Sequence, residues 1–245
     1  MLFTAALLVP AVAAAPKPDY AINSDKVETG VYLDVKIKAD PALAANCLSE
    51  GRKWAEKLHL ENVEARRSED PDLVKWRFQR DYQFLSVIDD RYISIFRIDS
   101  WSNGNGHSID TILWDKVAGR RISIRPFFQE TVDGGPTLIA MQTAIIASLK
   151  IALEKNDRGF AGDAHYRKQF EPTLLRIGPV SLASSTRDGK SSGLIFHYGP
   201  SLIGGYDVGL FRAFVPWQTL KPYLTPEGAR IFGGARPKSD ADGTQ

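Results

Sequence analysis

Cysteine and histidine are scarce in this sequence, and their scarcity excludes several kinds of site. Cys47 is the only cysteine among 245 residues, so an internal disulfide and a cysteine-rich metal cluster are excluded. We expect Cys47 to be a small buried residue on a helix face, because free cysteine is among the most buried residue types. The four histidines show no spacing typical of a zinc site, such as H-E-x-x-H. The sequence therefore predicts neither a metal nor a cofactor.

A strong excess of charge of either sign is also lacking. The chain has 31 basic and 29 acidic residues, a net charge of +2, which does not indicate a nucleic-acid or anionic-membrane partner. Neither a phosphate-binding glycine loop nor a G-x-S-x-G nucleophile motif is present. The composition, 43% hydrophobic and 24% charged, is that of a globular protein and excludes collagen-like, coiled-coil and wholly disordered chains.

The first fifteen residues have most features of a secretory signal peptide. Met1 to Ala15 contains no charged residue, and although a basic n-region is missing, its apolar run ends in small residues. Cleavage is expected after Ala13 or Ala14, because cleavage after Ala15 would place Pro16 first in the mature chain. The segment is too short for a membrane span, which needs about 20 apolar residues. We therefore expect a periplasmic or secreted protein without a membrane span.

The remaining pattern predicts an α+β fold, with an antiparallel sheet packed with two main amphipathic helices. The helices are expected over residues 41–60 and 136–156, since apolar residues recur there at helical spacing. Strands are expected at 31–38, 74–88, 92–100, 109–114, 122–124, 174–177, 180–185, 193–198 and 208–215, with a short helix at 217–223. Residues 16–232 are interpreted as one module, alternatively as two packed halves at 20–130 and 131–232, and residues 233–245 as a disordered tail.

Two segments carry motifs of a known family. The first is the turn Gly104–His107, followed by Asp115–Phe128 with its Asp-x-x-x-Gly sequence, short hydrophobic strand and Phe pair. Asp115 is expected to accept backbone N–H groups in a hairpin turn where Gly119 adopts a positive φ. The second segment is Gly193–Pro200, with Tyr206, Gly209 and the pair Val215-Pro216 following at the family's spacing.

In these motifs the chain resembles the extracytoplasmic module of RsiV-like anti-sigma factors and PdaC-like peptidoglycan deacetylases, a family of domains of unknown function. The resemblance covers roughly residues 24–225. Ser201, Leu202 and Gly205 stand where the family usually has Tyr, Glu and Pro, so no role of that Tyr–Glu pair is carried over. The resemblance implies a non-catalytic binding module at the cell envelope, with peptidoglycan or a lysozyme-like protein as ligand.

The predicted binding site combines the two glycine-containing loops, since both match family motifs and hydrophobic periodicity requires neither. Glycine lets a backbone approach a partner closely, and a tyrosine offers an apolar face with a polar tip. The site residues are Asn105, Gly106, His107, Pro200, Tyr206 and Gly209. Alternatively, the glycines serve tight connections and Tyr206 fills the core.

Two further hypotheses remain open in the sequence. One is a hydrolase that uses His107. The other is a carbohydrate or peptide platform built from aromatic residues, although aromatic residues on strands are more often core. The candidates for the platform are Trp101, Trp114, Trp217, Tyr92, Tyr198 and Tyr206.

Overall fold

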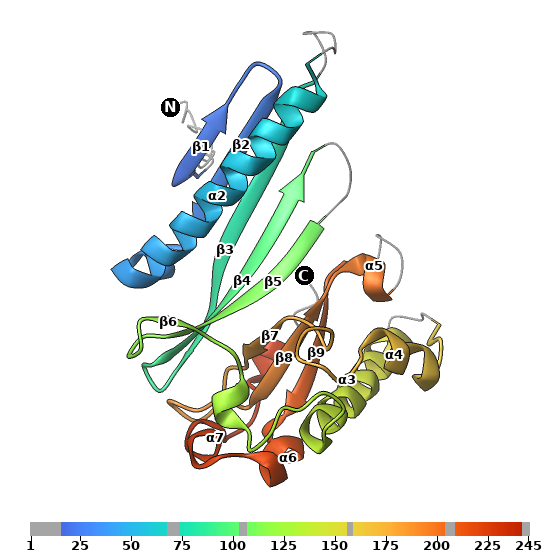
Figure 1. Ribbon diagram of the computed structural model, residues 1–245. Helices are drawn as coiled ribbons and strands as arrows, with labels where there is room; N and C mark the ends of the chain where they lie inside the picture. Colours follow the sequence, from blue (N-terminus) through green and yellow to red (C-terminus); the bar gives the residue numbers. More distant parts are fainter. Residues whose placement is uncertain (1–15, 68–73, 103–106, 156–158, 204–208, 242–245) are drawn as a thin grey trace, which may run out of the picture.

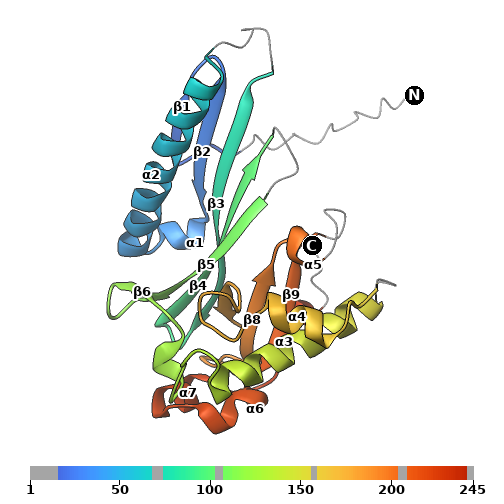
Figure 2. The ribbon, with the colours of Figure 1, turned by 45° about the vertical axis from the view of Figure 1, so that its right-hand side comes forward.

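The structure, a computed structural model, describes residues 16–67, 74–102, 107–155, 159–203 and 209–241. Two sheets form two parts of the molecule, and the long strands of the first sheet extend from one part to the other (Figures 1 and 2). Helices cover each sheet on one side, so the fold is α+β, as the sequence predicts.

The first sheet has six strands in sequential order and is covered by a long helix. Every neighbouring pair is antiparallel except β2 and β3, which are parallel and joined by a helical crossover. The strands are β1 (Tyr20–Asn23), β2 (Val27–Leu33), β3 (Trp76–Ile88), β4 (Tyr92–Trp101), β5 (His107–Asp115) and β6 (Arg120–Ile122), and the crossover helices are α1 (Val35–Lys38) and α2 (Pro41–Ala65). Helix α2 begins where the sequence predicts, since Asp40 accepts a hydrogen bond from Leu43 N and Pro41 occupies the first turn.

The second sheet has three antiparallel strands, in the order β7, β8, β9. Its elements are β7 (Val180–Leu182), β8 (Gly193–Tyr198) and β9 (Phe211–Pro216), with helices α3 (Pro136–Lys155), α4 (Asp163–Gln169), α5 (Pro200–Ile203), α6 (Trp217–Leu220), α7 (Pro226–Ile231) and α8 (Lys238–Ala241) and the 3-10 turns η1 (Arg125–Phe127) and η3 (Lys221–Tyr223). Strand β7 lies against the first sheet, because Leu182 N donates to Ser94 Oγ at 3.0 Å and Val180 N donates to Thr111 Oγ1 at 2.8 Å.

Helix α3 confirms the amphipathic helix predicted over residues 136–156. The predicted stripe of Leu138, Met141, Ile145, Leu149 and Leu153 is buried, each residue at most 2% exposed. The helix is long and apolar enough to cross a membrane by length and composition alone. Its buried stripe packs on β9 and the surrounding core, as expected for a core helix.

Two cores share the strands of the first sheet. One core lies under α2 and includes Leu43, Cys47 and Tyr82. The other lies under α3, and residues from the far ends of β3 to β5 join it, including Tyr92 and Leu113. The long strands therefore contribute side chains to both parts of the molecule.

Several sequence predictions are wrong in detail, among them the strand expected at 122–124, which is β6 at Arg120–Ile122. The strand expected over 31–38 ends at Leu33, because Asp34 caps α1 by accepting a hydrogen bond from Lys36 N at 2.8 Å. Residues 174–177 form no strand, since Ile177 N donates to Thr173 O within a turn and Leu175 is 96% exposed. The predicted disordered tail packs on the body as far as α8 instead, where Trp217 Nε1 donates to Gly234 O at 2.9 Å.

Candidate functional site

An aromatic pocket lies between α2 and the first sheet, at the end where β4 finishes. Its volume is about 240 Å³. Helix α2 contributes side chains one turn apart, and β3 and β4 contribute residues from neighbouring register positions. The pocket is lined by Trp54, Leu58, Asn62, Phe78, Asp99 and Trp101, which we call the aromatic pocket.

A buried ion pair holds one wall of the aromatic pocket in place. Arg80 donates two hydrogen bonds to Asp99, at 2.6 and 2.7 Å, and both side chains are at most 10% exposed. The Arg80 guanidinium also lies 4.4 Å from the ring centre of Trp54, a cation–π contact. The tryptophan on the helix and the aspartate on the sheet are therefore positioned by the same arginine.

Glu50 extends this network along α2. Its carboxylate contacts Arg97 and Arg121 directly and lies 3.7 Å from Arg80. Burial by itself would raise the pKa of Glu50, but the hydrogen bond from Arg121 and the neighbouring arginine charges together lower it. Helix α2 is thus fixed to the sheet by charge as well as by its apolar face.

The aromatic pocket combines flat apolar walls with a small number of polar acceptors. Trp54 and Trp101 are partly exposed, and Asp99 and Asn62 bring oxygen atoms to the same space. A carboxylate oxygen that already accepts from an arginine has a further lone pair, so Asp99 can also accept from a ligand hydroxyl. Apolar walls with a few convergent polar groups are typical of sites for small organic ligands, sugar rings among them.

The predicted loop site is only partly within the described residues. Asn105, Gly106 and Tyr206 lie outside them. His107 is exposed at the first position of β5 and pairs with Ser100, next to Trp101. Pro200 begins α5, and Gly209 is exposed with a φ of +74°, a conformation that favours glycine. The role of these residues in binding stays a prediction.

His107 and the aromatic pocket lie at the same end of β4 and β5. Trp101 is among the platform candidates of the sequence, whereas Trp54 is not, because it lies within the helix predicted over residues 41–60. Trp54, Leu58 and Asn62 recur every four residues, and this spacing was the signal for a second, partly polar face.

The other platform candidates within the described residues are mostly core. Tyr92, Trp114 and Tyr198 are at most 2% exposed, so they cannot form an open platform. Trp217 is half-buried against the core under α3. Cys47 is fully buried as expected, and burial raises the pKa of its thiol to about 12.

A serine–histidine pair that no motif revealed lies between the two sheets. Ser181 Oγ and His197 Nε2 are 2.8 Å apart, and both residues are at most 3% exposed. Burial, followed by the charge of Arg212, lowers the pKa of His197 to about 3, so the ring is neutral at physiological pH. Among the described residues no group of three histidine, cysteine or acidic side chains could hold a metal ion.

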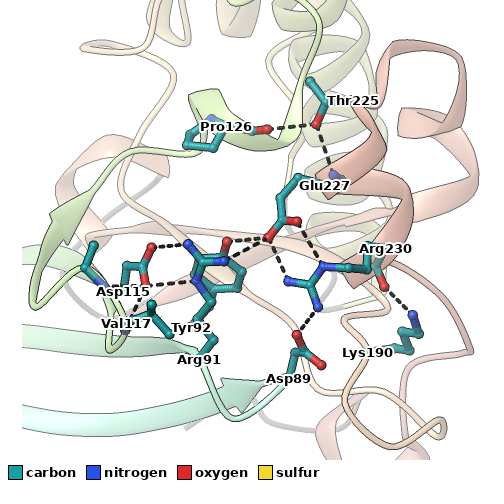
Figure 3. Close-up of polar contacts among 12 residues, drawn as sticks. Asp89, Arg91, Tyr92, Asp115, Val117, Pro126, Lys190, Thr225, Glu227 and Arg230 are labelled. Carbon is teal, nitrogen blue, oxygen red and sulfur yellow. Dashed lines mark hydrogen bonds and ion pairs between the residues drawn. The ribbon is translucent and has the colours of Figure 1, made fainter.

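A second ionic network joins α7 to the β3–β4 hairpin (Figure 3). Glu227 accepts from Arg230 at 2.7 Å and from the Tyr92 hydroxyl, and Arg230 also contacts Asp89. Asp115 accepts two hydrogen bonds from Arg91, at 2.9 and 2.7 Å. The network is far from the aromatic pocket and fixes the C-terminal helices to the first sheet.

The hairpin turn predicted at Asp115 is also confirmed, by the hydrogen bonds that its side chain accepts. Its Oδ1 accepts from the backbone N–H groups of Val117 and Ala118, at 3.0 and 3.1 Å. Gly119 has a φ of +60°, as expected for the glycine of such a turn. This family motif therefore stabilises the strand connection between β5 and β6.

Acid is expected to weaken the contact between α7 and the hairpin. The hydrogen bond from Arg230 is the main cause that lowers the pKa of Glu227, to about 2 from an ordinary value of 4.5. A carboxyl whose folded pKa is lowered stabilises the protein fully above its unfolded pKa. That contribution is lost as the pH falls from about 4.5 to about 2.

The measurement for this expectation is urea denaturation of the wild type and Glu227→Gln across that pH range. The variant should be less stable at neutral pH, and the difference should shrink as the pH approaches 2. Glu171→Gln is the matched control, because Glu171 forms an exposed pair with Arg176. A stability difference for Glu227→Gln that does not change with pH would contradict the assigned role.

Solved structures with a similar fold come from a family of unknown function. A DUF3298 family protein from Pseudomonas aeruginosa PAO1 aligns with a TM-score of 0.51 and 16% identity, over 84% of this chain and 87% of that chain. A DUF3298 family member from Bacteroides fragilis NCTC 9343 aligns with a TM-score of 0.47 and 12% identity, over 81% and 84%. No family model and no curated protein matches the sequence. The Pseudomonas structure shows the shared fold, in agreement with the expected relation to domains of unknown function.

Proposed function

We propose that this protein is an exported, non-catalytic binding module of the cell envelope that holds a sugar ring of peptidoglycan in the aromatic pocket. The observation that carries the proposal is the pairing of two partly exposed tryptophans, Trp54 and Trp101, with the acceptor Asp99 in one pocket. The apolar segment from Leu2 to Ala15 supports export. The resemblance of the two motifs to an RsiV-like and PdaC-like module supports an envelope ligand.

Two of the residues that line the aromatic pocket are held in place by the same arginine. Trp54 is held by the Arg80 guanidinium, and Asp99 by two hydrogen bonds from the same group. A side chain fixed before binding loses little conformational entropy when a ligand arrives. The volume of about 240 Å³ suits one sugar ring rather than an extended chain, so neighbouring rings would lie outside the pocket.

A hydrolase that uses His107 gains no support from the geometry. His107 is exposed, and within the described residues its side chain has no hydrogen bond to a hydroxyl or carboxylate. A histidine base is ordinarily oriented by such a partner. A lysozyme-like protein remains the competing ligand, and the experiment below separates it from the glycan.

Trp101→Ala is expected to weaken the binding of soluble peptidoglycan fragments at least about tenfold, because a tryptophan that packs on a ligand contributes roughly 2 kcal/mol or more. The measurement is isothermal titration of the mature protein with muropeptides that contain a disaccharide. Trp54→Ala should give a loss of similar size, since its ring lines the same pocket.

Trp217→Phe is the matched control, because Trp217 packs against the other core. The control should bind muropeptides as the wild type does. Equal muropeptide affinity in wild type, Trp54→Ala and Trp101→Ala would refute the aromatic pocket as the binding site. Capture of lysozyme without any muropeptide binding would refute the glycan and favour the protein ligand.

A further inference from the structure

A second pocket lies on the opposite side of the long strands, between the two sheets and the C-terminal segment. Its volume is about 240 Å³. Strand β3 borders it through Ser86, β7 and β8 form its floor, and α8 closes one side. We call this the arginine pocket, and its polar lining includes Ser86, Ser181, Ser184, His197, Arg212 and Arg236.

Two arginines give the arginine pocket its positive charge. Arg212 is the β9 register partner of His197, and Arg236 precedes α8. Within the described residues neither arginine forms an ion pair with a carboxylate within 4.0 Å. The acidic residue in the lining, Asp240, accepts from Arg236 through its backbone carbonyl at 2.5 Å. The pocket thus brings two guanidinium groups together without an equal number of carboxylates.

Arg236 is held in an environment that favours an added anion. Its Nε atom is buried and has no hydrogen-bond partner among the described residues, and its guanidinium lies 5.0 Å from the ring centre of Phe214. Burial is the main cause that lowers the pKa of Arg236. The charge of Asp240 opposes this effect, and the smaller effect of the Arg212 charge adds to it. A buried donor without a partner and a like charge nearby are both unfavourable, and an anion between the arginines would relieve both.

The floor of the pocket is uncharged and combines polar groups with the apolar side chains of Leu182 and Ile195. Ser181 and His197 share a hydrogen bond of 2.8 Å, and Ser86 Oγ donates to Leu182 O at 2.7 Å. Hydrolysis at this serine is disfavoured, because the histidine is neutral with a pKa of about 3 and is a poor proton acceptor. The Ser86 hydroxyl proton is already used by Leu182 O, so the donors left for an anion are the two guanidinium groups and, when His197 Nε2 donates to Ser181 Oγ, the Ser181 hydroxyl.

We infer that the arginine pocket binds a small oxyanion of the phosphate class, either free phosphate or the phosphate of a phosphomonoester. Planar guanidinium groups match the oxygen geometry of phosphate and form paired hydrogen bonds with it. A volume of about 240 Å³ holds a phosphate together with a small substituent. This inference is independent of glycan binding, since the two pockets share no lining residue.

The experiment is a titration of the mature protein with inorganic phosphate at constant ionic strength, followed by calorimetry and by the melting temperature. Phosphate should bind and raise the melting temperature, whereas chloride at the same ionic strength should not. Arg212→Gln and Arg236→Gln should each weaken phosphate binding at least tenfold. Arg125→Gln is the control, because Arg125 is an exposed arginine outside the pocket, and it should bind as the wild type does.

A further titration identifies the form of the ligand, and two lysine variants distinguish a loss of binding from a loss of the fold. Glycerol 1-phosphate that binds more tightly than phosphate supports a phosphomonoester, and weaker binding supports free phosphate. Arg212→Lys and Arg236→Lys keep the charge and should retain part of the affinity, which a variant that had lost its fold would not. Equal binding of phosphate by wild type, Arg212→Gln and Arg236→Gln, or no binding beyond that of chloride, would overturn the inference.

Discussion

Arg80→Met is expected to lower the free energy of unfolding by about 3 to 5 kcal/mol, the usual cost of removing one partner from a buried ion pair. The side chains of Arg80 and Asp99 are 6% and 10% exposed, so the variant would leave the Asp99 carboxylate buried without its partner. The contact of Arg80 with the Trp54 ring would be lost as well. The effect is measured by urea denaturation, with circular dichroism as the signal.

Two further variants test whether burial is the cause. Arg80→Met combined with Asp99→Leu should regain part of the lost stability, because no buried charge then lacks a partner. Arg176→Met breaks the pair with Glu171, whose side chains are 67% and 42% exposed, and should cost at most about 1 kcal/mol. An equal cost for Arg80→Met and Arg176→Met would refute a buried ion pair beneath the aromatic pocket.

Phe127→Ala is expected to lower the free energy of unfolding by about 3 to 5 kcal/mol, as large-to-small changes of buried aromatic residues do. Phe127 is fully buried, and its ring centre lies 5.0 Å from that of Tyr92 and 6.2 Å from that of Phe232. It therefore joins the first sheet to the C-terminal segment. Its backbone carbonyl also accepts from Thr225 N at 3.1 Å.

The same denaturation measurement applies, with two comparisons. Phe127→Leu should cost less than Phe127→Ala, because most of the side-chain volume remains. Val117→Ala should change stability by less than about 0.5 kcal/mol, since Val117 is 78% exposed. A Phe127→Ala variant as stable as Val117→Ala would show that the two parts of the molecule do not depend on this contact.

The sequence was sufficient for features that depend on neighbouring residues. The stripe on α3 identified the core helix, because residues one turn apart point the same way whatever they pack against. Asp89 and Asp90 lie between the predicted strands 74–88 and 92–100, at the turn between β3 and β4, and both have a positive φ, at +54° and +49°. Asp115 likewise marked its own turn, since the groups it binds are two and three residues away.

The sequence was insufficient where the same local pattern is compatible with two different backbone structures, such as a strand and a turn. The alternation that predicts a strand over 31–38 includes Asp34, whose side chain instead caps a helical turn. Leu174 to Ile177 is apolar enough for a strand, but no strand within the described part of the chain pairs with it, and its backbone forms a turn. Phe196 and His197 are neighbours on a strand and point to opposite faces, yet both are buried because β8 is the central strand of its sheet and is covered on both faces.

The fold class, the two long helices and most strands follow from the sequence, because hydrophobic periodicity and turn chemistry act between residues close in the chain. Which side chains meet in a pocket depends instead on how elements far apart in the chain pack together. Trp54 and Trp101 come from a helix and a strand that pack together, and Arg212 and Arg236 from a strand and a terminal segment. Such contacts depend on register and on packing between sheets, and no spacing along the chain encodes them.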